Sequence, residues 1–237
     1  AYYSAGGAGM NVVLLDGLVK ILLVLILVSA VFIITRRDLF SLFRSYSFQS
    51  ALIALIAFFL YLREWNIVLL FMAILTLLSK SILIPRILKK VYSSMNNQHD
   101  VEFCYLQPSG SIFVSIILII LVQIIFSRIL AGLALDNLFF IGAVLGMSLT
   151  LIGMMIVFSR KKVVSKIVGY LVMENGVVLF SLFLSELPFL IEVFVLMDLI
   201  MLVIIAAVLA FGIDSSIEQF HAKLNPFRAW FRRGDKR

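Results

Sequence analysis

Long apolar runs make up most of the chain, and they limit the structures that it can form. Seven runs, each of about 19 to 25 residues, lack the alternation of polar and apolar residues that marks a strand. They cover roughly residues 12–34, 41–62, 67–88, 112–130, 138–158, 165–184 and 189–213. Backbone polar groups in lipid need partners within their own segment, so such runs predict helices. The sequence therefore predicts an all-α, polytopic membrane bundle of about seven transmembrane helices.

The composition excludes several classes of protein. Of the 237 residues, 63% are hydrophobic and only 14% are charged, which is far from the composition of soluble domains. The net charge of +7 falls in short loops and in the tail, which indicates a solvated positive flank and no nucleic-acid partner. Cys104 is the single cysteine, and His99 and His221 lack ligand spacing, so we expect no disulfide framework and no metal site.

Three parts follow from this pattern. Residues 1–11 are small and we expect them to be flexible, with Met10 as a candidate original start. Residues 12–213 form the predicted seven-helix domain, in which 165–213 is an acidic helix hairpin. Residues 214–237 alternate aromatic and basic side chains, which predicts a basic amphipathic tail on anionic lipid or on a cytoplasmic partner subunit.

The basic residues also predict the orientation. Sixteen of the 20 lysines and arginines fall on one side of the predicted spans, and Arg63 and Arg128 fall on the other. Lysine and arginine accumulate in cytoplasmic loops. We therefore expect a multi-pass protein of the plasma membrane with its N-terminus outside and its C-terminus in the cytoplasm.

A weak internal repeat is visible at an offset of 124 residues. A basic loop at 35–38 precedes a run that contains Tyr46, as the loop at 159–162 precedes a run that contains Tyr170. Both runs cross in the same direction, which is compatible with a degenerate parallel repeat of a three-helix unit. Basic loops before apolar helices also resemble one another by topology alone.

Three ionisable residues lie deep inside apolar runs. Glu174 and Asp198 fall near the middle of two consecutive runs, and Lys80 falls within a third. Charges at that depth are costly and mark functional sites, usually facing a protein interior or a water-filled cavity. Loss of hydration favours the neutral acid, so these carboxylates suit a proton relay. Interhelical hydrogen bonding for the acids and snorkelling for Lys80 are the structural alternatives.

Smaller polar groups and glycines accompany these charges. Pro85 cannot donate to the carbonyl of Ser81, which predicts a kink or local hydration one turn beyond Lys80. The supporting polar or hinge residues are therefore Asn175, Tyr170, Ser79, Ser81 and Pro85. Gly142, Gly146, Gly169 and Gly176 predict close helix packing. Asp16 and Lys20, four residues apart, are expected to pair with each other.

No nucleotide-binding loop, metal constellation or nucleophile triad is present in the sequence. The glycines at 142 and 146 lie inside a hydrophobic run, so they do not form a phosphate-binding loop. We predict no catalytic residues and expect that the chain is not an enzyme by itself.

The segment from Ser159 to Gly176, with Met-Glu-Asn-Gly at 173–176 and the downstream Asp198, resembles membrane component E of hydrogenase-4 and formate hydrogenlyase complexes. The Lys-x-x-Leu-x-Pro pattern at 80–85 is similar to that family's corresponding span. The C-terminal helices are also similar to the small K subunit of respiratory complex I and to the C component of Mrp-type antiporters. Leu171 stands at the K-subunit glutamate position, and Glu174 comes one turn later.

The resemblance implies a membrane subunit of a complex-I-like, energy-converting assembly that moves protons or sodium ions. It implies antiporter-like and other membrane-arm subunits, lipid and a peripheral redox module as partners. Nickel-iron, iron-sulfur or quinone sites would lie in those partners, with no cofactor in this chain. A structural spacer of the membrane arm and a stand-alone cation or proton transporter are the alternatives.

Overall fold

The structure is a computed structural model that describes residues 4–36, 38–94, 107–129, 136–160, 163–183 and 200. Every regular element in this part of the chain is a helix. The elements are α1 (Ser4–Thr35), α2 (Leu39–Glu64), α3 (Ile67–Thr76), the π-helix η1 (Leu77–Leu83), α4 (Ile84–Ser94), α5 (Pro108–Ile129), α6 (Asn137–Ser159) and α7 (Val163–Leu182).

Six helices in the described residues are long and apolar enough to cross a membrane. The chain is therefore a multi-pass membrane protein, with α3, η1 and α4 together forming one span from Ile67 to Lys89. Apart from residue 200, the seventh predicted span, 189–213, lies outside the described residues, as does the tail at 214–237. The α1 helix begins at Ser4, inside the segment 1–11 that the sequence predicts to be flexible. A helix that is already nucleated extends at the gain of one hydrogen bond per residue.

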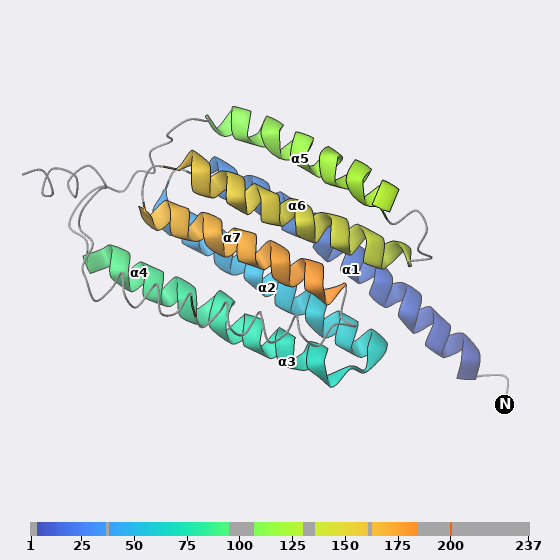
Figure 1. The fold of residues 1–237 in the computed structure, drawn as a ribbon. Coiled ribbons are helices and arrows are strands. Elements are labelled where there is room, and N and C mark those ends of the chain that lie inside the picture. Colours follow the sequence, from blue (N-terminus) through green and yellow to red (C-terminus); the bar gives the residue numbers. More distant parts are fainter. Residues whose placement is uncertain are drawn as a thin grey trace, which may run out of the picture.

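The spans lie side by side and alternate in direction (Figure 1). The α5 helix forms one edge of the bundle and the α3–η1–α4 span forms the other, with α1, α2, α6 and α7 between them. We call the end that carries Arg36, Arg86 and Arg160 the basic end, and the end that carries Arg63 and Asp136 the opposite end. These two names describe the bundle and assign no side of the membrane.

The short connections between spans are closed by local hydrogen bonds. Asp38 caps α2, accepting from the backbone N–H of Ser41 at 2.8 Å, and Asn66 caps α3 in the same way through Val68. Trp65 between these two helices has a left-handed backbone, with φ of 54°. Side-chain caps satisfy the N–H groups that a helix leaves without partners, which is why α2 and α3 can follow each other so closely.

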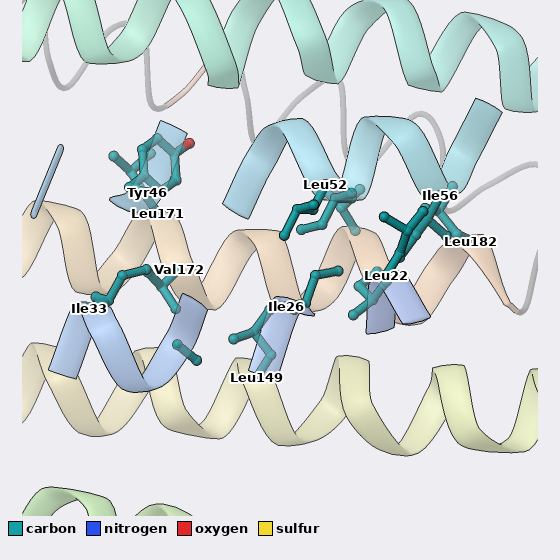
Figure 2. Close-up of a cluster of buried hydrophobic side chains, with 14 of the residues drawn as sticks. Leu22, Ile26, Ile33, Tyr46, Leu52, Ile56, Leu149, Leu171, Val172 and Leu182 are labelled. Carbon is teal, nitrogen blue, oxygen red and sulfur yellow. The ribbon is translucent and has the colours of Figure 1, made fainter. Parts of the chain in front are cut away.

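The core lies where α1, α2, α6 and α7 meet. Figure 2 shows Leu22, Ile26 and Ile33 of α1 packed with side chains from the other three helices. The labelled partners are Tyr46, Leu52, Ile56, Leu149, Leu171, Val172 and Leu182, each at most 7% exposed. Surrounding lipid is as apolar as these side chains, so tight packing contributes more to helix association here than burial from water does.

Glycines bring α6 and α7 into close contact. A Cβ atom added to Gly146 would fall on the backbone of Phe180, and one added to Gly176 would fall on the backbone of Thr150. Gly142 faces the ring of Phe183, Gly169 faces Ile156 and Val157, and Gly153 faces the backbone of Met173. The four glycines singled out from the sequence lie in this contact, and Gly153 is an additional member.

The helix boundaries follow the offset of 124 residues. The α1 helix ends at Thr35 and α6 ends at Ser159, while α2 begins at Leu39 and α7 begins at Val163. Each pair of boundaries is separated by 124 residues. The third helix of the second unit would fall at 189–213, where the structure describes only residue 200, so the duplication stays a prediction.

Charged side chains join the helices at both ends of the bundle. At the opposite end, Arg63 contacts Asp16 at 3.2 Å and Asp136 at 2.6 Å, which links α2 to α1 and to the start of α6. The expected pair of Asp16 with Lys20 is therefore wrong. Asp16 pairs with the planar guanidinium of Arg63 on a neighbouring helix, which suits a carboxylate better than an ammonium does. Within the described residues Lys20 forms no ion pair.

At the basic end, Arg160 is buried instead of lying in the solvated flank that its position in a basic loop predicts. It is 2% exposed and donates to the backbone carbonyl of Ile34 at 2.8 Å and to that of Ile33 at 3.4 Å. These carbonyls lie at the C-terminus of α1, where a cation is favourable. Burial lowers the pKa of Arg160 to about 10, which leaves the side chain charged at neutral pH.

The Arg63 contact predicts a pH dependence of stability. The hydrogen bond from Arg63 holds the pKa of Asp136 below its ordinary value of 3.8. A carboxyl with a lowered folded-state pKa stabilises the fold above pH 3.8 and loses that contribution as the pH falls further. Asp136 is 49% exposed, so we expect the contribution to be at most about 1 kcal/mol.

The measurement is the melting temperature of the purified protein between pH 6 and pH 3, for the wild type and for Arg63→Gln. The two proteins should differ near pH 6 and approach each other below about pH 4. A difference that stays constant over this range would show that the Asp136 carboxylate does not contribute through Arg63.

Candidate functional site

The centre of the bundle contains a buried ion pair. The Nζ atom of Lys80 lies 3.1 Å from Oε1 of Glu174, and the two side chains are 1% and 2% exposed. Lys80 comes from η1 and Glu174 comes from α7. The α2 helix contacts both of these helices. The sequence placed both residues inside apolar runs and left open whether they approach each other. The structure brings them into direct contact.

Both members of the pair lie far from either end of their spans. At ~1.5 Å per residue, Glu174 lies roughly 17 Å from the start of α7 and roughly 12 Å from its end. Lys80 lies roughly 20 Å from Ile67 and roughly 14 Å from Lys89 in its own span. Two opposite charges at this depth stabilise each other, because both side chains are almost inaccessible to bulk water.

The backbone around Lys80 is wound as a π-helix. In η1 the N–H of Ile84 donates to the carbonyl of Ser79, a spacing of five residues, and Pro85 follows within α4. The Ser81 carbonyl, to which Pro85 cannot donate, accepts from the hydroxyl of Ser47 at 2.6 Å. The Ser81 hydroxyl donates in return to the carbonyl of Ser47 at 3.2 Å. The Ser47 side chain of α2 thus replaces the backbone donor that Pro85 lacks. Short π-helical segments occur often at functional sites.

A second buried polar cluster lies beside the ion pair. Nδ2 of Asn175 donates to Oγ of Ser50 at 2.9 Å and to Oε1 of Gln49 at 3.3 Å. Nε2 of Gln49 donates to Oγ of Ser29 at 3.1 Å, and that hydroxyl donates to the carbonyl of Ile26. The four side chains are at most 2% exposed and connect α1, α2 and α7.

The other supporting residues lie close in sequence to the pair. Tyr170 precedes Glu174 by one turn of α7 on the same side of that helix and is partly buried. Ser79 precedes Lys80, and its hydroxyl donates to the carbonyl of Leu75 at 2.7 Å. Pro85 is buried at the start of α4. Asp198, the second predicted acid, lies outside the described residues.

Several members of the site were not selected from the sequence. Three of them are polar residues within apolar runs: Gln49, Ser29 and Ser47. Their depth within those runs was the signal in the sequence that could have identified them. Ser50 lies 124 residues before Glu174, the offset of the internal repeat, but this position does not predict its contact with Asn175. Serine also bonds readily to its own helix, so its position in a run cannot reveal an interhelical partner.

The chemistry of the site follows from these groups. The Lys80 ammonium and the Glu174 carboxylate are in direct contact, so a proton can pass between them without an intermediate and leave a neutral amine and a neutral acid. A third protonation state, an ammonium beside a neutral acid, carries one additional positive charge. No group of three or more metal-binding side chains occurs in the described ranges.

No protein-family model, curated protein or solved structure matches this chain.

Proposed function

We propose that this chain is a membrane subunit of a complex-I-like, energy-converting assembly and that Glu174 and Lys80 exchange protons during ion translocation. The observation that carries this proposal is the contact of 3.1 Å between the two side chains at the centre of the bundle, both nearly inaccessible. A buried pair costs several kcal/mol of desolvation per ion and is weak evidence for a role in stability. Intramembrane ionisable groups are rare and costly, and they mark ion pathways, proton relays and other functional sites.

The proposed cycle uses the protonation states of the pair. A proton that reaches Glu174 removes the negative charge 3.1 Å from the Lys80 ammonium, and the remaining positive charge repels further cations. Loss of a proton from Lys80 then restores neutrality, so one positive charge enters and one leaves. Asp198 is the proposed next acceptor, on the basis of its position in the sequence. Tyr170 lies one turn from Glu174 towards the basic end of the bundle. It is the proposed polar group of the proton relay on that side of Glu174.

The proposed assembly is a group 4 hydrogenase or formate hydrogenlyase relative, on the basis of the Met-Glu-Asn-Gly element at 173–176 and the Lys-x-x-Leu-x-Pro pattern at 80–85. Antiporter-like membrane subunits and a peripheral redox module would be its partners, and the module would hold the metal or quinone cofactors. The proposed location is the plasma membrane, with the basic end in the cytoplasm.

The test is Glu174→Gln in the intact assembly, purified through a tag on this chain and reconstituted into vesicles. We expect loss of coupled ion translocation, measured with a pH-sensitive or sodium-sensitive dye, while electron transfer to soluble dyes stays largely intact. Glu64→Gln is the matched control, because it makes the same change at the exposed end of α2.

Full pumping by the Glu174→Gln assembly would contradict the proposal. The chain would then act as a spacer that seals the membrane arm. Ion transport by this chain without any partner subunit would instead favour a stand-alone transporter. The proteins that copurify with the tagged chain distinguish these two outcomes.

A further inference from the structure

One face of the bundle combines exposed arginines with a strip of exposed apolar side chains. Arg44 lies roughly 7.5 Å inside the start of α2, within a membrane span, yet it is exposed on the outside of the bundle. Arg86 of α4 is exposed roughly 4.5 Å inside the end of its own span. Within the described residues neither arginine forms an ion pair, and a charge inside a membrane span is costly without a partner.

The Ser47–Ser81 hydrogen bonds fix how the two helices are aligned. They place residue 47 of α2 opposite residue 81 of η1, and the two spans run in opposite directions. Arg44 lies three residues from Ser47 towards the basic end, and Arg86 lies five residues from Ser81 towards the same end. The two guanidinium groups therefore lie at similar depth on neighbouring helices, with the exposed Lys89 one turn beyond Arg86.

Apolar side chains continue this face towards the middle of the membrane. On α2 the exposed residues follow one stripe, and on the neighbouring span a second stripe lies at matching heights. We call this set the apolar strip: Phe48, Leu55 and Phe58 of α2, with Leu83, Ile74 and Phe71 opposite them, each 40% to 55% exposed. From Phe48 to Phe58 the strip spans roughly 15 Å, which matches the ~15 Å of one leaflet's hydrocarbon.

We propose that this face binds one anionic phospholipid, whose phosphodiester lies between Arg44 and Arg86 and whose acyl chains lie along the apolar strip. Arginine binds phosphate through two parallel N–H groups, and basic pockets between transmembrane helices bind acidic headgroups. The lipid lies on the outside of the contact between α2 and η1, where the hydrogen bonds between Ser47 and Ser81 join the two helices. Lipid binding at this face does not depend on ion translocation.

The experiment titrates the purified full-length protein in detergent with dioleoylphosphatidylglycerol and with dioleoylphosphatidylcholine and counts bound lipids by native mass spectrometry. The wild type should prefer phosphatidylglycerol. Arg44→Gln with Arg86→Gln should weaken phosphatidylglycerol binding about 30-fold, at about 1 kcal/mol per arginine, and should abolish the preference. Arg36→Gln with Arg128→Gln removes the same charge from two other exposed sites and should change binding less than about threefold.

Circular dichroism and melting temperature show whether each variant is folded. Unchanged phosphatidylglycerol binding by the first double variant, or an equal loss in the control, would overturn the proposal. Displacement of the lipid by millimolar glycerol 3-phosphate would also overturn it, because the site would then bind free anions. A photoreactive residue at position 48 in native membranes should label phospholipid. Labelling of residues beyond 183, or of another protein, would show a different occupant.

Discussion

Replacing Lys80 with methionine should lower the free energy of unfolding by about 3–5 kcal/mol at neutral pH. The change leaves the Glu174 carboxylate 2% exposed and without its cation, 3.1 Å from where Nζ was. Methionine fills a similar volume, so little of the loss would come from a cavity. Part of the loss should be recovered at low pH, because protonation removes the buried negative charge of Glu174. Equilibrium unfolding in mixed detergent micelles measures the effect.

The double variant Lys80→Met with Glu174→Gln is the decisive control. Removing both charges eliminates the desolvation cost together with the attraction, so the double variant should recover most of the stability that either single change loses. Additive losses would show that the two charges are not coupled. Single losses below about 1 kcal/mol would show that water reaches the pair and screens it.

Replacing Gly153 with alanine should lower the free energy of unfolding by about 3 kcal/mol, at the upper end of the usual cost of overpacking. The added methyl group would fall on the backbone nitrogen of Met173, and a backbone atom cannot move without shifting the whole of α7. The α6 and α7 helices would have to separate along a contact that also contains Gly146 and Gly176. The same unfolding titration measures this effect.

Gly17→Ala is the matched control for that change. No atom lies within 4 Å of the position that its Cβ would occupy, and it too lies within a helix. Alanine is the better helix former by about 1 kcal/mol, so Gly17→Ala should leave stability unchanged or raise it slightly. Equal effects of the two substitutions would mean that helix propensity, and not close contact of α6 with α7, decides the outcome.

The sequence was sufficient for the helices because their signal is local. A run such as 41–62 or 138–158 must be helical in lipid whatever surrounds it, and both runs agree with α2 and α6 within about two residues at each end. The depth of Lys80 and Glu174 was equally visible, because depth depends only on the position within a run. The same reasoning identified Pro85 as a break in hydrogen bonding, although it could not name Ser47 as the replacement donor.

The sequence predicted the contacts of charged residues near helix ends less well. Arg160 belongs to a basic loop, which predicts solvation, but it is buried against the C-terminus of α1. Asp16 has a lysine one turn away in its own helix, but it pairs with Arg63 of α2. Local spacing favours partners within one helix, whereas the geometry of the bundle decides which helix supplies the carbonyl or the guanidinium.

The sequence by itself determined the six spans of the described residues and the positions of Lys80 and Glu174 deep within two of them, because hydrogen bonding in lipid constrains each segment separately. Only the tertiary structure decided that Lys80 meets Glu174, that Asn175 meets Gln49 and Ser50, and that Gly153 belongs to the α6–α7 contact. These contacts join residues that are 20 to 126 positions apart in the chain. Their existence depends on how each helix is rotated about its axis, and that rotation is set by packing against all of its neighbours at once.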